Sequence, residues 1–366
     1  MENFLSDLIQ EQNNSGINAS AIVHRTSGAQ KKYSCSEYPI YSVPSYGRFI
    51  YAPISPTFPI YFKKIIAQIK PDIIHFHKPN TSAFSAILLS SAKSIPWVIH
   101  WHSDVVSSTI DKRLQIAYRL YKPFEHYMVK KSKAIITTSS PYLEYSQSLS
   151  PWRNKCHVVS LGVDPKRFVL PNPELISWAE HMWQDNHFRV LTIGRLTYYK
   201  GHEILIKAAS LLPTIQVIIV GTGDTYSKLK HLILQLGLQS RVILTGFLDE
   251  SKMNALLSTC NCFCLPSVER TEAFGLVLLE AMAFSKPIVA SKIPGTGIGW
   301  VVSHNETGLC IPPADPSALA SALTYLSEYP EIAQKMGKSA LLRFNQEFQI
   351  KTISQRIVQI YQSIGC

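Results

Sequence analysis

Two glutamates separated by seven residues, Glu272 and Glu280, are the side chains of this sequence best placed to do chemistry. They lie in the stretch from Leu265 to Phe284, with a Phe-Gly step between them at 274–275. The apolar run 261–266 predicts a buried strand before them, and the apolar residues after Gly275 predict a helix interrupted by Glu280. A strand, a loop and a helix N-terminus form a phosphate site in α/β proteins, because free N–H groups point outward there.

An ordinary structural interpretation of the two glutamates stays open. Glu280 can cap a helix or pair with a neighbouring cation, while Glu272 faces solvent. A carboxylate on so apolar a helix is costly unless it is partnered or bonded to a ligand. The surrounding residues therefore decide between the two interpretations.

Cationic side chains follow another predicted strand, at 188–193. Its loop carries Gly194, Arg195 and Lys200. Arg195 offers a bidentate fork and Lys200 a point charge, which together suit one diphosphate. Charged hydrogen bonds of this kind contribute roughly 1.5–3 kcal/mol each. They matter most when a diphosphate leaves with growing negative charge.

The pattern Glu-Ala-Phe-Gly, four residues, Glu-Ala-Met-Ala at 272–283 resembles the signature of family 4 glycosyltransferases. These are retaining enzymes that use nucleotide-sugars and have the GT-B fold. The Gly-Arg-Leu…Lys-Gly motif at 194–201 and the Gly-Thr-Gly turn at 221–223 match the same family. The resemblance covers nearly the whole chain except its beginning. It implies an α/β protein of two Rossmann-like parallel-sheet domains that face a cleft.

The resemblance also implies roles for individual residues. Glu272 would bind sugar hydroxyls, Glu280 the ribose, and Arg195 and Lys200 the diphosphate. Other donor contacts would come from the glycine loops and from the Phe-Gly step with the two amides that follow it: Gly194, Gly221, Gly223, Phe274, Gly275, Leu276 and Val277. A plain tight turn is the alternative for Gly221 and Gly223.

The acceptor side is predicted in the first half of the chain. His102, in the segment His100-Trp-His-Ser-Asp104, aligns with a family histidine near the transferred sugar. A histidine at a strand tip is often structural, which is the alternative here. Asp104 would orient that imidazole or hold the acceptor. Glu2 fits the last position of a family Gly-Gly-x-Glu motif.

Composition narrows the class of protein. With 366 residues, 46% hydrophobic and 17% charged, the chain is globular and long enough for two domains. The sequence has no run of 18 apolar residues, so no membrane span is predicted. The first 25 residues do not have the pattern of a signal peptide, and none is expected. The alternating Cys260, Cys262 and Cys264 mimic a metal site, but reduced core cysteines are the better account, and no metal is expected.

Alternating strand and helix patterns predict the domain boundaries. We expect an N-terminal acceptor-side domain at 1–162, a linker at 163–186, a nucleotide-sugar-binding domain at 187–346, and a helix at 347–366 that returns to the first domain. The predicted strands are 19–24, 71–77, 96–104, 134–138 and 156–160, then 188–193, 215–220, 241–245, 261–265, 287–290 and 308–311. The chief predicted helices are 1–12, 62–70, 83–92, 111–131, 315–328, 331–346 and 350–363.

The beginning of the chain departs from the family pattern. A doubly wound domain normally opens with a strand and a glycine-rich loop, whereas this sequence opens directly on the predicted helix. The first domain is therefore expected to lack its first strand and Gly-Gly loop. An upstream start or a truncated, inactive homologue would each explain this.

Charge is concentrated in the first half of the chain. Residues 1–160 hold 18 Lys and Arg against 9 Asp and Glu, and the rest of the chain is nearly balanced. The segment 111–131 interleaves cations with aromatic residues, which suits either an ordinary solvated helix face or docking on anionic lipid. The basic half also fits a pyrophosphate-bearing acceptor.

The resemblance implies a retaining glycosyltransferase that moves a hexose to a lipid-linked or cell-surface glycan. The segments 293–300 and 101–104 look like those of bacterial enzymes of cell-surface polysaccharide assembly, often mannosyltransferases, so mannose from GDP-mannose is the preferred donor sugar. Lipopolysaccharide or another polysaccharide would be the product, and no cofactor is expected. The predicted location is cytoplasmic, with peripheral binding to the cytoplasmic face of the inner membrane. The alternatives are another GT-B enzyme such as a nucleotide-sugar epimerase, the inactive homologue, and a nucleic-acid binder, for which no recognisable motif is present.

Overall fold

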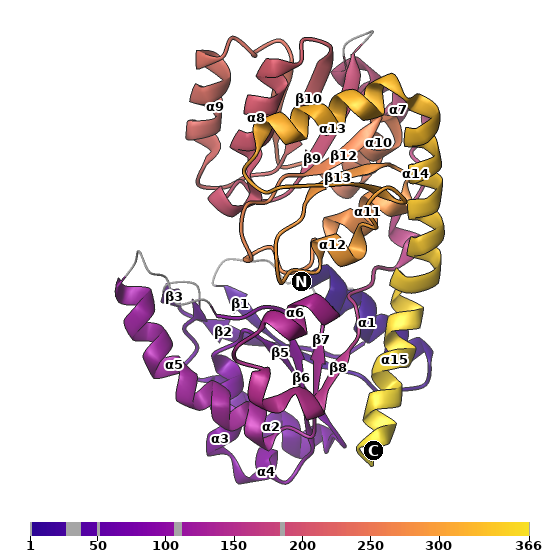
Figure 1. Cartoon of the computed structure of the whole chain (residues 1–366). Coiled ribbons are helices and arrows are strands. Elements are labelled where there is room, and N and C mark those ends of the chain that lie inside the picture. Colours follow the sequence, from indigo (N-terminus) through magenta and orange to yellow (C-terminus); the bar gives the residue numbers. More distant parts are fainter. Residues whose placement is uncertain (1, 27–37, 50–51, 106–111, 184–186, 366) are drawn as a thin grey trace. The chain divides into compact units, whose positions relative to one another are not determined.

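The computed structural model describes residues 2–26, 38–49, 52–105, 112–183 and 187–365. The chain divides into two units (Figure 1). The first unit comprises Met1–Ser160 with Ile350–Cys366, and the second comprises Leu161–Gln349. Each is an α/β unit built on parallel strands, which confirms the predicted fold class.

A six-stranded sheet forms the centre of the second unit, with the spatial order β11-β10-β9-β12-β13-β14. Every neighbouring pair in it is parallel. Its strands are β9 (Phe188–Ile193), β10 (Ile215–Val220), β11 (Val242–Gly246), β12 (Cys262–Leu265), β13 (Ile288–Ser291) and β14 (Gly308–Ile311). Strand β10 is buried along its whole length, as expected when helices cover both faces of a parallel sheet.

Helices cover both faces of this sheet. They are α7 (Pro173–Met182), α8 (His202–Leu211), α9 (Tyr226–Gln235), α10 (Glu250–Thr259), α11 (Val277–Ala283), α12 (Ile298–Val301), α13 (Pro316–Glu328) and α14 (Pro330–Arg343). Helix α8 packs against α9 and α13, and α7 packs against α10 (Figure 1). A π-helical turn at Phe344–Phe348 follows α14, and 3₁₀ turns occupy Pro165–Arg167 and Tyr198–Lys200.

The main core of the second unit lies between the sheet and α8, α9 and α13. Cys262 and Cys264 point into it beside Val190 and Leu319. Burial raises the pKa of Cys260 to about 11 and raises that of Cys262 well above its ordinary value. These thiols therefore behave as small core side chains.

The first unit holds a four-stranded parallel sheet with the order β5-β6-β7-β8. Its strands are β5 (Ile74–Lys78), β6 (Trp97–Trp101), β7 (Ala134–Thr137) and β8 (Cys156–Val158). Two small sheets accompany it, a parallel pair of β1 (Ala21–Thr26) with β2 (Ile40–Ser45) and an antiparallel pair of β3 (Arg48–Phe49) with β4 (Ala52–Pro53). The pattern did not predict β2, because its Tyr, Ser and Pro content is typical of a loop.

The helices of this unit are α1 (Glu2–Asn14), α2 (Phe58–Ile69), α3 (Ser85–Leu88), α4 (Ser90–Lys93), α5 (Lys112–Lys131), α6 (Ser140–Tyr145) and α15 (Ile350–Ser363). There are 3₁₀ turns at Ser82–Phe84 and Ser150–Lys155. The predicted continuous helix 83–92 is wrong, because Leu89 is extended and separates α3 from α4. Helix α5 continues through Pro123. No described helix is long and apolar enough to span a bilayer.

The first and last helices of the chain pack together within the first unit. Helix α15 packs against α1, and the Tyr361 hydroxyl lies 2.7 Å from Nδ1 of His75 on β5. Helix α7, which lies in the segment 163–186 expected as a linker, packs on α10. Asn172 caps α7 by accepting a hydrogen bond from the amide of Leu175 at 2.9 Å.

Candidate functional site

The strand order of the second unit points to a ligand site at the carboxyl ends of its central strands. Chain order runs outward from β9 through β10 to β11 on one side, and from β12 through β13 to β14 on the other. The order therefore reverses between the neighbouring strands β9 and β12. Ligands of open α/β sheets bind outside the carboxyl ends of the strands at such a reversal. The loop after β9 carries Lys200, and the loop after β12 carries Glu272.

An ion pair joins these two loops. Lys200 Nζ lies 2.5 Å from Glu272 Oε2, and the two side chains are only 12% and 11% exposed. Ser267 donates a longer hydrogen bond to the same carboxylate oxygen, at 3.5 Å. The backbone ties the loops together as well, because the Val268 amide donates to the Tyr199 carbonyl at 2.9 Å. Two residues predicted at the site are thus brought into direct contact.

Arg195 is exposed, and its backbone is anchored from two sides. Its carbonyl accepts a hydrogen bond from the Thr197 amide at 2.9 Å and lies 3.4 Å from Nε2 of His202. Burial lowers the pKa of His202 to about 4, so this ring is neutral and can donate to that carbonyl. The guanidinium is left at the surface of a fixed loop, where it can meet an incoming anion.

The glycine turn after β10 packs directly on the loop after β9. Gly221 has φ +145°, and a Cβ added there would stand 1.9 Å from the Gly194 carbonyl oxygen. A Cβ on Gly223 would stand 2.3 Å from the Leu196 carbonyl oxygen. The two glycines therefore allow one loop to lie against the other. This contact gives them a structural purpose in addition to the predicted approach to a nucleotide.

The start of α11 follows the Phe-Gly step. Phe274 is buried and packs edge-on against Phe348, so its ring belongs to the core. The amides of Leu278 and Leu279 donate to the carbonyls of Gly275 and Leu276. The amides of Leu276 and Val277 come before these first helical hydrogen bonds, which is where a helix offers N–H groups to an anion.

Glu280 lies in the first turn of α11 and is half-buried. Desolvation raises its pKa to about 7, while the nearby positive charge of Arg167 acts in the opposite direction. Arg167 also forms an ion pair with Glu250, with Nη2 2.6 Å from Oε1. Sequence reasoning missed Arg167, because it lies in the segment expected as a linker and no motif marks it.

The predicted acceptor-side residues belong to the first unit. His102 follows β6 and is buried, and its Nε2 lies 2.9 Å from Nδ1 of His77. Among the described residues its Nδ1 has no hydrogen-bond partner, so Asp104 does not orient the ring. Asp104 instead accepts hydrogen bonds from Trp101 Nε1 at 2.9 Å and from Ser146 Oγ at 2.7 Å. Glu2 begins α1, and its side chain lies outside the described part of the structure.

A buried cation near His102 was also missed. Lys78 ends β5, is 1% exposed, and has its Nζ 4.3 Å from the ring centroid of Phe84 and 4.6 Å from that of Tyr121. Burial lowers its pKa to about 8 against the opposing charge of Glu125. In the sequence Lys78 is only a lysine at the end of an apolar strand, so its burial could not be anticipated.

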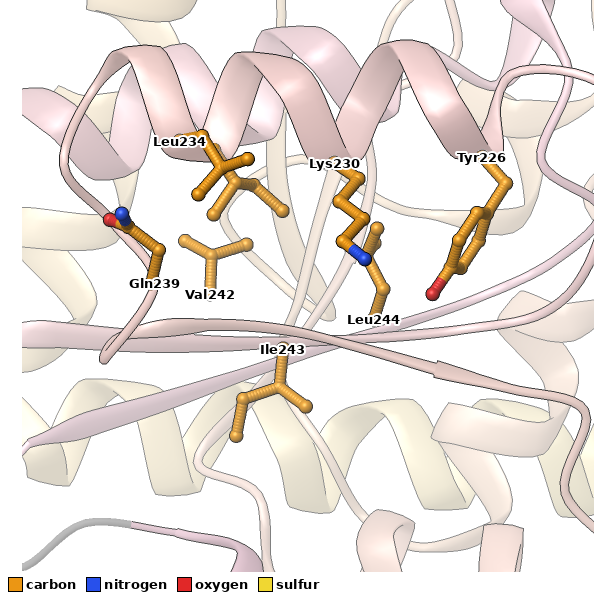
Figure 2. Close-up of a pocket in the computed structure, with 8 residues that line it drawn as sticks. Tyr226, Lys230, Leu234, Gln239, Val242, Ile243 and Leu244 are labelled. Atoms are coloured by element: carbon orange, nitrogen blue, oxygen red, sulfur yellow. The ribbon is translucent and has the colours of Figure 1, made fainter.

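A hollow on the second unit lies apart from these residues. It is found between α9 and the edge strand β11, and Figure 2 shows Tyr226, Lys230 and Leu234 pointing from the helix toward that strand. Its lining is completed by Ile233, Gln239, Val242, Ile243 and Leu244. Because β11 is at the end of the sheet, this hollow is not at the reversal of strand order.

Comparisons with known proteins agree with the geometry. Residues 1–167 match the family described as Glycosyltransferase Family 4, and residues 178–343 match Glycosyl transferases group 1. The O-antigen chain mannosyltransferase C of Escherichia coli is 31% identical over 87% of this chain and 83% of its own length. The D-rhamnosyltransferase WbpZ of Pseudomonas aeruginosa is 31% identical over 78% of this chain and 72% of its own length.

The chain is a family 4 glycosyltransferase.

Solved structures support the GT-B fold of this glycosyltransferase. A sucrose-phosphate synthase from Thermosynechococcus elongatus superposes with a TM-score of 0.81 at 22% identity, covering 99% of this chain and 92% of that one. Anabaena HepE in complex with UDP superposes with a TM-score of 0.76 at 23% identity, covering 98% and 95% of the two chains. At this level of identity the likeness establishes the fold.

Proposed function

We propose that this glycosyltransferase moves a hexose, preferably mannose from GDP-mannose, to a lipid-linked or cell-surface glycan with retention of configuration. The observation that carries the donor site is the Lys200–Glu272 ion pair at the reversal of strand order between β9 and β12. The preference for mannose rests on the similarity to a relative named as an O-antigen chain mannosyltransferase.

The donor would be held by groups from three loops of the second unit, those after β9, β10 and β12, together with the start of α11. Arg195 and Lys200 would meet the diphosphate, together with the amides of Leu276 and Val277. Glu272 would accept hydrogen bonds from sugar hydroxyls and Glu280 from the ribose. The glycine turn at 221–223 would place backbone beside the nucleotide. These charges act most strongly as the diphosphate departs, because its negative charge then grows in a partly desolvated site.

Transfer needs no cofactor in this proposal. The acceptor oxygen would approach the anomeric carbon from the side on which the diphosphate leaves, so that retention requires no protein nucleophile. His102 and Asp104 would serve the acceptor side. The exchange of partners by Lys200, from Glu272 to the diphosphate, would couple arrival of the donor to release of the Glu272 carboxylate for the sugar.

A donor screen followed by product analysis tests this proposal. GDP-mannose should raise the unfolding temperature of the full chain more than GDP alone, UDP-glucose or UDP-galactose, and Glu272→Gln should weaken that shift. The anomeric configuration of the product, measured by NMR with the acceptor glycan, should match that of the donor. An inverted product contradicts the retaining mechanism. Release of an epimer without any acceptor would favour an epimerase instead.

Helix α5 supports the peripheral membrane role that we propose for the first unit. Its described part exposes the cations Arg119, Lys122 and Lys130 together with the apolar side chains Leu120 and Phe124. Cations beside exposed apolar groups favour the surface of an anionic bilayer, at about 1 kcal/mol for each cation near the lipid.

Vesicle sedimentation tests this role. Full-length chain should bind phosphatidylglycerol-containing vesicles at low salt, and Lys122→Gln with Lys130→Gln should reduce binding by about tenfold or more. Lys335→Gln with Lys338→Gln removes the same charge from α14 and serves as the control. Equal binding by the two double variants would contradict docking through α5.

A further inference from the structure

Four histidines share one face of the sheet in the first unit. His75 and His77 are two residues apart on β5, and His100 and His102 are two residues apart at the end of β6. The register places His77 directly opposite His100. Because alternate residues of a strand point to the same side, the four rings gather in a two-by-two group. The rings of His75 and His100 stack at 5.5 Å between centroids, and those of His100 and His102 at 4.3 Å.

This histidine group contains buried nitrogens without partners. His100 is fully buried, and neither of its ring nitrogens has a hydrogen-bond partner among the described residues. The same holds for Nε2 of His75 and Nδ1 of His102. A buried polar group left unsatisfied destabilises the fold, because it has given up its hydrogen bonds to water. Several of them side by side indicate a ligand that accepts or donates at this point.

The other nitrogens are held as a metal site requires. Nδ1 of His75 lies 2.7 Å from the Tyr361 hydroxyl on α15, and Nδ1 of His77 lies 2.9 Å from Nε2 of His102. Each bond fixes one ring nitrogen and leaves the Nε2 of that histidine for a metal, the usual arrangement around ligating histidines. Phe4 of α1 covers the group, with edge-on contacts to His77, His100 and His102.

We propose that His75, His77 and His100 bind one divalent transition-metal ion, with zinc as the probe. One ligand atom from each lies within 4.8 Å of the other two. A tetrahedral ion at about 2.0–2.1 Å from each nitrogen places its ligand atoms about 3.4 Å apart. Small rotations of the rings, which move the nitrogen atoms by roughly 1 Å, would bring the three into this arrangement. An all-imidazole set selects zinc, copper, nickel or cobalt over magnesium and calcium, which prefer oxygen.

The three proposed ligands come from the neighbouring strands β5 and β6. The ion would join β5 to β6 and fix the strand ends that carry Lys78 and His102. In this proposal the ion has a structural role and takes no part in the sugar transfer proposed above.

Metal content and stability of the full chain test the site. The protein is stripped with a chelator, exchanged into chelator-free buffer and titrated with Zn²⁺ by calorimetry. One ion should bind, and the unfolding temperature should rise, because a ligand that binds only the folded state stabilises it. Cobalt substitution should give the intense visible absorption of a tetrahedral nitrogen site. Absence of bound zinc in the wild type would overturn the proposal.

Variants separate a metal site from a stack of core rings. His75→Gln and His100→Gln should abolish zinc binding. Tyr361→Phe, which keeps the packing and removes only the hydroxyl, should weaken it by about 10–100-fold. His126→Gln changes an exposed histidine of the same unit and should leave binding unchanged. If Tyr361→Phe and His100→Gln bind zinc as tightly as the wild type, the ion lies elsewhere and the assignment is wrong.

Discussion

At the scale of single residues, the contact between Lys200 and Glu272 changes what each side chain is expected to do. Both side chains were predicted to bind the donor, and in the structure they form an ion pair with each other. Removing one partner of a buried pair leaves the other charge desolvated and unpaired. A loss of activity in a single variant therefore mixes a structural effect with a functional one.

A double-mutant cycle separates the two effects. Lys200→Met and Glu272→Gln should each lower the free energy of unfolding by about 3 kcal/mol, since each strands a buried charge. The double variant should recover part of that loss, because it has no unpaired charge, yet it should stay inactive in transfer. Denaturant unfolding beside turnover measures both quantities. Additive losses of stability, with no recovery, would show that the ion pair contributes little to the fold.

The raised pKa of Glu280 predicts that this residue lowers the free energy of unfolding at high pH. Folding raises this pKa from 4.5 to about 7, so the folded chain binds more protons than the unfolded chain between those pH values. Stability contributed by this group is therefore full below pH 4.5 and is lost as the pH rises through 7. Glu280→Gln should unfold at a higher temperature than the wild type at pH 8, and at the same temperature near pH 4.

The same variant should bind the donor more weakly, by about 10–100-fold, because it loses a charged acceptor for the ribose. Glu306→Gln removes an exposed carboxylate of the same unit and is the control for both measurements. A Glu280→Gln variant with unchanged donor affinity would remove Glu280 from the site, whatever its effect on stability.

At the scale of elements, the site depends on loops that fit closely together at the carboxyl ends of β9, β10 and β12. The turn at Gly221 lies against the Gly194 carbonyl, and Gly201 stands so close to the Pro266 carbonyl that an added Cβ would be 1.9 Å from that oxygen. The loop with Arg195 and Lys200 is thereby held between its two neighbours. Its cations are positioned by backbone contacts that no side-chain motif describes.

Gly221→Ala should displace this arrangement. The new Cβ would collide with backbone, so we expect a loss of more than about 3 kcal/mol in stability and a large loss of donor binding. Gly237→Ala is the matched control, since Gly237 also has a positive φ but nothing within 4 Å of the added Cβ. That control should cost only about 1 kcal/mol. Similar losses in both variants would attribute the effect to backbone strain alone.

Sequence patterns predicted the elements of the second unit well for a physical reason. Its strands are short apolar runs between polar loops, and β9, β10 and β14 begin and end at the predicted residues. Contacts set by register could not be predicted in this way. The spacing of His75 with His77 and of His100 with His102 is visible in the sequence, but the pairing of His77 with His100 arises only when β5 meets β6.

The prediction of one helix at 83–92 was wrong for a different reason. Its apolar periodicity is sufficient, but Leu89 adopts an extended backbone between the short helices α3 and α4, and Ser90 and Ser91 follow it directly. Serine competes for backbone hydrogen bonds and favours such breaks. The ion pair between Lys200 and Glu272 likewise joins residues far apart in the chain. Candidate residues were therefore predictable, whereas their partners were not.

At the scale of the whole molecule, the first unit is discontinuous in sequence and the second is inserted within it. Helix α15 closes the first unit by packing on α1, with Ile353, Ile357 and Ile360 buried along one face. Its Tyr361 also reaches His75 on β5. The C-terminal segment of the first unit, which begins at Ile350, should therefore stabilise the N-terminal part of the same unit.

Ile357→Asn tests this dependence in the full-length chain. A polar side chain in place of a buried isoleucine should cost about 2–5 kcal/mol. Hydrogen exchange followed by mass spectrometry should show faster exchange in α1, β5 and β6, because these elements share a unit with α15. Strands β9 to β14 should exchange at the wild-type rate, since they have their own core. Gln359→Asn, two residues further along α15 on its exposed face, should change neither set. If exchange rises equally in the strands of both units, α15 stabilises the chain as a single cooperative body and the division into two folding units is wrong.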